Sequence, residues 1–334
     1  MLTECRQDSF DFASLGSRKV TAAFDGGAIT SNAGALLLRE ANGRIGLSQQ
    51  VAACFRDGRK PHLTEHRVET LVAQRIHGIA LGYEDLNDHD ELRHDPVPGL
   101  LSGKLEARRR DCAVLAGKST LNRLEHAPRP GGDRYRKLDV DDEAMKRLFV
   151  SVFLQGHAAA PKRIILDPGA TDDPIHGEQE GRFFHGYYDC YCYLPLYVFC
   201  GRHLLVAKLR KADIDASAGA IEEIARVISR IRAAWPRVRV LLRADAGFAR
   251  DGLMAWCEAN GVDYLFGLAK NERLKAELAA DLAATARESQ ETGKSARRFT
   301  DFVYKTRDTW SRERRVVGKA EWMPPSPAEA VRKQ

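Results

Sequence analysis

The chain has 334 residues and carries 52 Lys and Arg against 46 Asp and Glu, a formal net charge of +6 with His neutral. Hydrophobic residues make up 44% and charged residues 29% of the chain, which supports a packed core and excludes a disordered or fibrous protein. No apolar run of about 18 residues occurs, and Glu4 and Asp8 lie where a signal peptide would be apolar. We therefore expect a cytoplasmic protein with no membrane partner, built as two domains or one large one.

Cysteine usage and charge narrow the function classes further. The seven cysteines are scattered without a single C-x-x-C pair, which argues against a disulfide framework and against a zinc knuckle. A net charge of +6 is compatible with a polyanionic partner, although many soluble enzymes that bind no nucleic acid are equally basic.

The first part of the chain is predicted to be mainly helical. Residues 1–18 lack a pattern, and residues 19–27 are typical of a short strand that ends in a turn. Ser31 and Asn32 are expected to cap a following helix, because their side-chain oxygens can accept hydrogen bonds from free backbone amides. Apolar residues at three- and four-residue intervals predict a second helix over about 64–81.

A polar, irregular stretch over about 87–111 ends in three consecutive arginines, Arg108, Arg109 and Arg110. They could form a solvated surface or a patch that contacts phosphates, and the sequence leaves both interpretations open.

A short helix capped by Ser119 and Thr120 follows the arginines in the prediction. Residues 126–136 have the Pro, Gly and charge content of a linker, so we expect a domain boundary near 130–160.

The second part predicts a mixed sheet with helices on its faces. A strand rich in β-branched residues is predicted over 163–167. A β-rich stretch over 183–209 breaks at Pro195 and at a Gly201-Arg202 turn. Because that turn is too short for a crossover connection, the strands on its two sides are expected to be antiparallel. Later apolar patterns then alternate between helix and strand, giving the order β-β-β-α-β-α-β-α followed by a hairpin after residue 293. The predicted segments are helix 221–231 ended by Pro236, strand 238–245, helix 253–258, strand 262–269 and helix 271–282.

Two of the predicted strands end in an aspartate, Asp167 and Asp245. Carboxylates at the ends of neighbouring strands converge at one edge of a sheet, where they can hold Mg²⁺ for chemistry on a phosphodiester. The alternative is structural, because an Asp at a strand end often caps the turn that follows it.

Three long segments carry a family pattern, in the order FDGGAITSNAGALLLRE, IILDPGATDDPIHGEQEGRFFHGYYDCYCYLPLYVF and LLRADAGFARDGLMAWCEANGVDYLFGLAKN. Together they resemble the DDE transposases of bacterial insertion sequences, specifically the transposase DDE domain group 1. The resemblance implies an α/β fold, a ribonuclease H-like mixed sheet flanked by helices and preceded by a mainly helical region. It also implies a protein that binds double-stranded transposon ends, cuts donor DNA and joins it to target DNA with Mg²⁺ or Mn²⁺. A homo-oligomer is a possible assembly of such a protein.

The resemblance assigns the catalytic and metal-binding role first to Asp245, which lies in the R-A-D-x-G-F motif. The family motif for the first acid is L-D-x-D-A-T, and its metal-binding position here is Gly169. Asp167 is the second candidate for catalysis and metal binding, but it lies roughly 6–7 Å back along the strand on the same face. A metal site tolerates less displacement than that.

DNA contacts are predicted at three places. The H-G-x-Q-E-G-R stretch contributes His176, Gln179 and Arg182, which could equally belong to a solvated loop. The other two places are the arginines at 108–110 and the pair Arg297 and Arg298, which would bind phosphates without reading sequence.

The third acid of the family lies in a Tyr-x-x-Arg-x-x-x-Glu helix that this sequence does not contain. We therefore expect a C-terminally truncated transposase with little or no strand transfer. Its expected regions are 1–150 for binding DNA ends, 160–290 for an incomplete catalytic core, and 291–334 for the start of a hairpin insertion and a frayed end. The alternatives are a non-catalytic DNA-binding remnant and, less favoured, another ribonuclease H-like nuclease.

Overall fold

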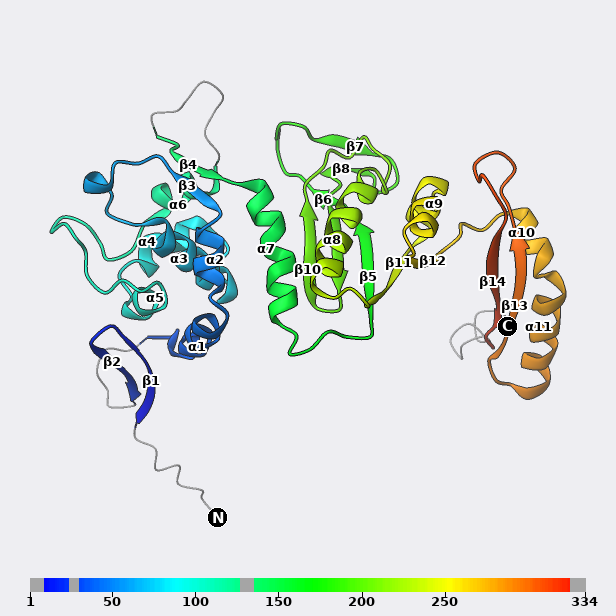
Figure 1. Cartoon of the computed structure of the whole chain (residues 1–334), viewed down its shortest axis with the longest axis horizontal. Helices are drawn as coiled ribbons and strands as arrows, with labels where there is room; N and C mark the ends of the chain where they lie inside the picture. The colour runs from blue at the N-terminus through cyan, green and yellow to red at the C-terminus, as the bar shows by residue number, and fades with distance from the viewer. Residues whose placement is uncertain (1–8, 24–29, 127–134, 325–334) are drawn as a thin grey trace, which may run out of the picture. The chain divides into compact units, whose positions relative to one another are not determined.

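The computed structural model describes residues 9–23, 30–126 and 135–324 (Figure 1). The chain divides into two compact units, an N-terminal unit of residues 1–158 and a C-terminal unit of residues 159–334. The turn predicted at the end of residues 19–27, most of the predicted linker and the predicted frayed end lie outside the described residues. No helix in the described part is long and apolar enough to cross a membrane.

The N-terminal unit is mainly helical, as expected. Its strands form two small antiparallel pairs, β1 (Ser9–Leu15) with β2 (Arg18–Ala23) and β3 (Phe55–Asp57) with β4 (Leu138–Val140). Its α-helices are α1 (Leu36–Ile45), α2 (Leu47–Ala52), α3 (Val68–Ala80), α4 (His89–Leu92), α5 (Pro96–Leu101), α6 (Lys118–Glu125) and α7 (Asp142–Gln155).

Helix α3 forms the centre of this unit and confirms the helix predicted over 64–81. Its apolar stripe buries Leu71 and Val72, which belong to the same core cluster as Leu121 of α6. Ile79, in contrast, is half exposed, because the stripe leaves the core at the end of the helix. Burying such side chains stabilises the fold by about 1.5–3 kcal/mol each relative to their exposure.

Both predicted helix caps are wrong in detail. Asn32 makes no side-chain capping bond, and its amide instead donates to the Asp95 carboxylate at 3.3 Å. Ser119 and Thr120 lie inside α6, whose first flanking residue is Gly117. The first strand was also missed, because residues 9–15 are mostly exposed and gain their order from pairing with β2 rather than from a local pattern.

The C-terminal unit has the mixed α/β architecture that the sequence predicts. Its central sheet has the strand order β10-β9-β5-β11-β12, in which β5, β11 and β12 run parallel and β9 and β10 form the predicted antiparallel pair. These strands are β5 (Arg163–Ala170), β9 (Leu196–Cys200), β10 (His203–Lys208), β11 (Arg239–Ala244) and β12 (Asp263–Phe266). A second, three-stranded sheet consists of β6 (Asp173–Pro174), β7 (Phe183–His185) and β8 (Cys190–Tyr193).

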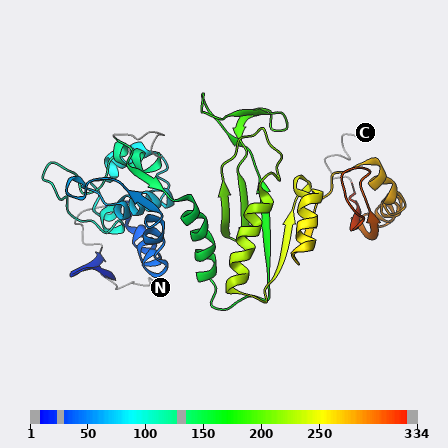
Figure 2. The same cartoon turned by 45° about the horizontal axis from the view of Figure 1, so that its top comes forward.

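Helix α8 (Ala220–Ala234) lies against one face of the central sheet (Figure 2). Its isoleucines recur at three- and four-residue intervals, and Ile224, Ile228 and Ile231 are buried, as the pattern predicts. Helix α9 (Asp251–Ala259) then connects β11 to β12 in the predicted order.

The chain leaves the sheet after β12 and builds two consecutive helices and a β-hairpin. The elements are α10 (Glu272–Glu277), α11 (Ala279–Thr292), β13 (Ala296–Tyr304) and β14 (Arg314–Trp322), so the predicted hairpin is confirmed. Tyr304 and Trp310 pack with Met254 of α9 in one buried cluster. Arg314 adds a buried ionic contact, since its guanidinium binds Asp251 at 2.7 Å and Glu258 at 2.8 Å.

Candidate functional site

Asp245 follows the last residue of β11 and is exposed at the rim of the central sheet. Its Oδ1 atom accepts a hydrogen bond from the Gly247 amide at 2.8 Å and so caps the turn that follows. Its Oδ2 atom accepts no hydrogen bond from the described part of the chain. The carboxylate therefore combines both interpretations of a strand-terminal Asp, with one oxygen that fixes the turn and one that faces outward.

Gly267, which follows β12, packs directly against the backbone of Asp245. Its amide donates to the Ala244 carbonyl at 3.0 Å. A Cβ atom on residue 267 would lie 3.1 Å from the Ala246 nitrogen and 3.4 Å from the Asp245 carbonyl carbon. Only glycine fits this contact without a backbone shift, so the neighbouring strand helps to fix the position of the Asp245 carboxylate.

Gly169 is the residue of β5 that lies level with Asp245. The parallel pairing aligns Leu241 with Ile165 and Leu242 with Leu166. Continued to the ends of the strands, this register places Asp245 beside Gly169. A Cβ atom on Gly169 would meet no atom within 4 Å, so the space beside Asp245 is open.

Asp167 lies two residues before Gly169, level with Arg243. The two side chains form a bidentate ion pair, with Arg243 Nε 2.7 Å from Asp167 Oδ1 and Nη2 2.9 Å from Oδ2. The Asp167 carboxylate raises the pKa of Arg243 through this hydrogen bond and its charge. The structure thus gives Asp167 an arginine partner and does not bring it level with Asp245.

A divalent metal centre needs more oxygen ligands than these residues offer. Mg²⁺ requires octahedral coordination by carboxylates, water and substrate phosphates, and two-metal chemistry requires several carboxylates within a few ångströms. In residues 9–23, 30–126 and 135–324, no group of three or more His, Cys, Asp or Glu side chains is arranged to hold a metal. Asp245 supplies one free carboxylate oxygen, so the residues present do not fit a complete metal centre.

The charges of Asp172 and Asp245 both act on the Tyr188 hydroxyl. Burial raises the pKa of this hydroxyl, and the negative charges of Asp172 and Asp245 raise it further. Sequence analysis did not connect Asp172 or Tyr188 with Asp245, because Asp245 lies far from both along the chain.

The predicted DNA-contacting loop lies between β6 and β7. His176 and Gln179 are exposed, as a DNA contact requires. Arg182 folds back on its own loop, where it donates to the Gly177 carbonyl and stacks 4.8 Å from the centre of the Tyr191 ring. Four of the aromatic side chains that follow are exposed, and Phe184 packs edge-on against Tyr191; the four are Phe183, Phe184, Tyr187 and Tyr191.

The arginine run at 108–110 is organised by a carboxylate that the sequence analysis missed. Glu65 is almost fully buried and accepts from the backbone amides of Arg108 at 2.7 Å and Arg109 at 3.2 Å, and from Lys104 Nζ at 2.7 Å. Burial alone would raise the pKa of Glu65, but the hydrogen bonds from Lys104 and Arg108 lower it to about 2. Arg110 remains exposed.

The third predicted DNA contact is partly neutralised within the β-hairpin. Arg297 pairs with Glu321 on the opposite strand, and Arg298 lies 3.4 Å from Glu288 of α11. Both guanidinium groups are exposed, yet each already has a carboxylate partner.

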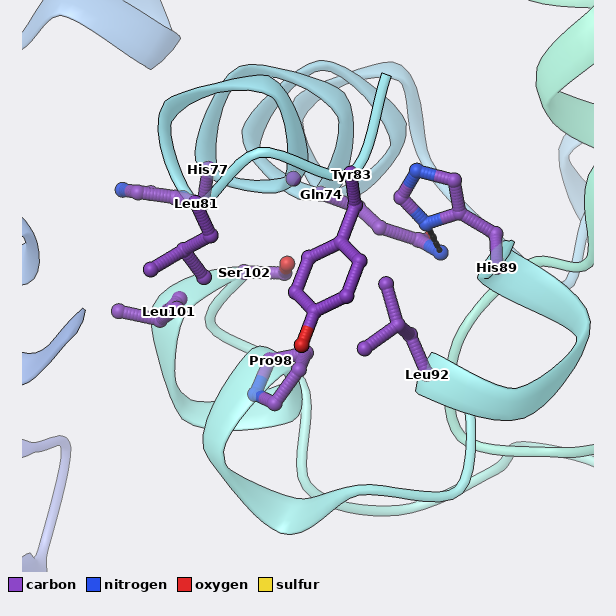
Figure 3. Close-up of a pocket in the computed structure, with 10 residues that line it drawn as sticks. Gln74, His77, Leu81, Tyr83, His89, Leu92, Pro98, Leu101 and Ser102 are labelled. Carbon is purple, nitrogen blue, oxygen red and sulfur yellow. Dashed lines mark hydrogen bonds between the residues drawn. The ribbon is translucent and has the colours of Figure 1, made fainter. Parts of the chain in front are cut away.

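A small cavity in the N-terminal unit is too narrow for a substrate. Its volume is about 10 Å³, the space for roughly one water molecule (Figure 3). His89 Nε2 and Ser102 Oγ are buried there with no hydrogen-bond partner among the described residues. Gly78 is needed beside them, because a Cβ atom at that position would lie 2.8 Å from His89 Cε1.

The family profile described as transposase DDE domain group 1 matches residues 12–328, which is nearly the whole chain. No curated protein and no solved structure matches the chain.

Proposed function

Because the chain belongs to the transposase DDE domain group 1 family, we propose that it is an insertion-sequence transposase that binds double-stranded DNA at transposon ends and at the target. Proteins of this family generally use divalent metal ions, so the reaction class is phosphoryl transfer supported by Mg²⁺ or Mn²⁺. We propose Asp245 as the carboxylate at the reacting phosphate. The observation that carries this assignment is its outward oxygen at the rim, held by Gly247 and Gly267.

We further propose that strand transfer by this chain is weak or absent. The reason is local: Gly169 occupies the position level with Asp245, and Asp167 is paired with Arg243. One outward carboxylate does not hold two metal ions. The second candidate function is therefore a DNA-binding member of the family that does not catalyse strand transfer.

Two assays on the purified chain separate these functions. The first measures nicking and joining of a labelled duplex with Mg²⁺ or Mn²⁺, and the second measures binding of the same duplex in EDTA. Binding that persists in EDTA without metal-dependent joining supports the non-catalytic function. Metal-dependent joining that is lost in Asp245→Asn would instead establish a working centre.

Location in the cytoplasm and assembly into a homo-oligomer stay predictions. Light scattering of the purified chain, free and with duplex DNA, measures the oligomeric state directly.

A further inference from the structure

Two adjoining hollows on the N-terminal unit share Arg123 and Tyr135, and together we name them the basic groove. Their volumes are about 720 and 640 Å³. Eight Lys and Arg side chains line the groove, whereas the only carboxylates among its described lining residues are Glu65 and Asp111. The eight cationic residues are Arg59, Lys60, Arg93, Arg109, Lys118, Arg123, Arg136 and Lys137.

The positive charge of the groove is only partly cancelled by neighbouring carboxylates. Glu65 is bound by Lys104 and by the backbone of the arginine run, and it also pairs with Arg109 at 3.4 Å. Arg59 pairs with Asp57 at 2.8 Å, so these two cations are partly neutralised. Lys60 and Lys137 form no ion pair within the described part of the chain, and both are exposed. A concave surface with this excess of cations concentrates the positive potential inside the groove.

Several of the cations are held in place before any ligand arrives. The Lys118 ammonium lies 3.1 Å from Asn87 Oδ1 and 3.4 Å from Asp90 Oδ2. The Arg123 guanidinium lies 5.8 Å from the centre of the Tyr135 ring, an aromatic side chain that is 62% exposed. Fixing the side chains in advance lowers the entropy lost when a ligand binds.

We propose that the basic groove binds the phosphodiester backbone of duplex DNA. This inference rests on the proposed function, which makes DNA the substrate, and adds where the N-terminal unit contacts it. Duplex DNA carries a continuous row of phosphates. Each phosphate that a groove cation neutralises releases counterions, and this release favours binding. A membrane surface is the poorer fit, since peripheral membrane binding uses a protruding apolar face beside the basic one.

The contacts are to phosphates, so they position the DNA and do not read its sequence. The groove includes Arg109 from the arginine run that sequence analysis singled out, but most of its cations come from other segments. The arginine run therefore contributes one side chain, Arg109, to a larger basic surface.

The test is a charge reversal inside the groove with a matched reversal outside it. The groove variant is Lys60→Glu, Arg123→Glu and Lys137→Glu, and the control is Arg44→Glu, Arg202→Glu and Arg237→Glu. The control side chains are exposed, lie outside the groove lining and form no ion pair in the described residues, and both variants change the net charge equally. Circular dichroism melting checks that both remain folded.

Fluorescence anisotropy with a labelled duplex, in EDTA and over a series of salt concentrations, measures binding without involving a metal. We expect the groove variant to bind at least about 10-fold more weakly than the control, and its salt slope to fall by roughly 2–3, near 0.9 for each lost phosphate contact. Equal losses in the two variants, or no loss in the groove variant, would overturn this inference while DNA binding by the unmodified chain upheld the proposed function. If the unmodified chain binds phosphatidylserine vesicles but no DNA, the inference and the proposed function both fail.

Discussion

Arg243 and Asp167 form a bidentate ion pair across two parallel strands, one step below the rim at which Asp245 lies. The pair explains why two aspartates at the ends of neighbouring strands do not make a metal centre here. The guanidinium satisfies both oxygens of Asp167, and the rim position beside Asp245 is a glycine. This edge of the sheet therefore carries the charged carboxylate of Asp245 at the rim and the Arg243–Asp167 ion pair, whose net charge is zero, below it.

Restoring a carboxylate at position 169 should create a cation site. In Gly169→Asp the new side chain extends into open space level with Asp245, and the backbone of Gly169 is not in the left-handed region. We expect affinity for Mn²⁺ to rise by about 10-fold over the unmodified chain, because two carboxylates bind a hard cation better than one. Isothermal titration calorimetry with MnCl₂ measures the change. The control is Gly169→Asn, which has the same shape without the charge, and equal Mn²⁺ binding by both variants would contradict the assignment of this rim.

Adding one methyl group at position 267 should disturb the Asp245 turn. In Gly267→Ala the Cβ atom meets backbone atoms of Ala246 and Asp245, which cannot rotate away as a side chain could. We expect a loss of about 1–3 kcal/mol in the free energy of unfolding, measured by urea denaturation. Gly186→Ala is the control, since its Cβ atom would meet nothing within 4 Å. A Gly267→Ala protein as stable as the control would show that the turn does not depend on this contact.

Removing the Arg314 guanidinium should leave two carboxylates without their buried partner. We expect Arg314→Met to lower the free energy of unfolding by roughly 3 kcal/mol at neutral pH, as measured by urea denaturation, because Asp251 and Glu258 stay charged in a partly buried site. Its neighbour Arg315 pairs with Asp301 on the exposed side of the hairpin, so Arg315→Met should change little.

The pH dependence of that loss follows from Glu258. Burial alone would raise its pKa, but the hydrogen bonds from Arg314, Tyr264 and Arg312 lower the pKa to about 2, below the ordinary value of 4.5. A lowered carboxyl pKa stabilises the folded state above pH 4.5, and this stabilisation is lost as the pH falls toward 2. The difference between the unmodified protein and Arg314→Met should therefore shrink over that interval, and a constant difference would argue against the ion pair.

The lowered pKa of His66 should make the N-terminal unit less stable in mild acid. Burial and the charges of Lys104, Arg59 and Arg109 lower the pKa of His66 to about 4, although Glu65 acts in the opposite direction. The unfolded chain takes up a proton near pH 6.5 and the folded chain only near pH 4, so stability falls as the pH drops through this interval. Thermal melts of His66→Gln should depend less on pH between 6.5 and 4. His62→Gln, an exposed residue of the same segment, serves as the control, and identical pH profiles for both variants would refute the effect.

Elements with a strong local period could be predicted from the sequence. The isoleucine stripe of α8, the strands β5 and β11 and the final hairpin all follow from patterns within the elements themselves. The displacement of Asp167 from position 169 could also be anticipated, because a strand advances by a fixed rise per residue. The register that brings Gly169 beside Asp245 comes from the pairing of β5 with β11.

Features that depend on distant residues could not be predicted in this way. Asn32 bonds to Asp95 instead of capping its helix, and no local pattern records a partner 63 residues away. Glu65 organises the arginine run from 43 residues earlier in the chain. The basic groove likewise gathers cations from five separate segments, each of which alone is typical of a solvated surface.

Arg314 also links the β-hairpin to α9 through two ion pairs. Hydrogen exchange reports the smallest unit that must unfold to free a given amide, and such units coincide with elements that share buried contacts. Since Arg314 connects β14 to both ends of α9, and Trp310 packs against Met254, the hairpin does not fray as an isolated ribbon. We therefore expect the amides at the Tyr304–Arg314 end of the hairpin to exchange together with those of α9.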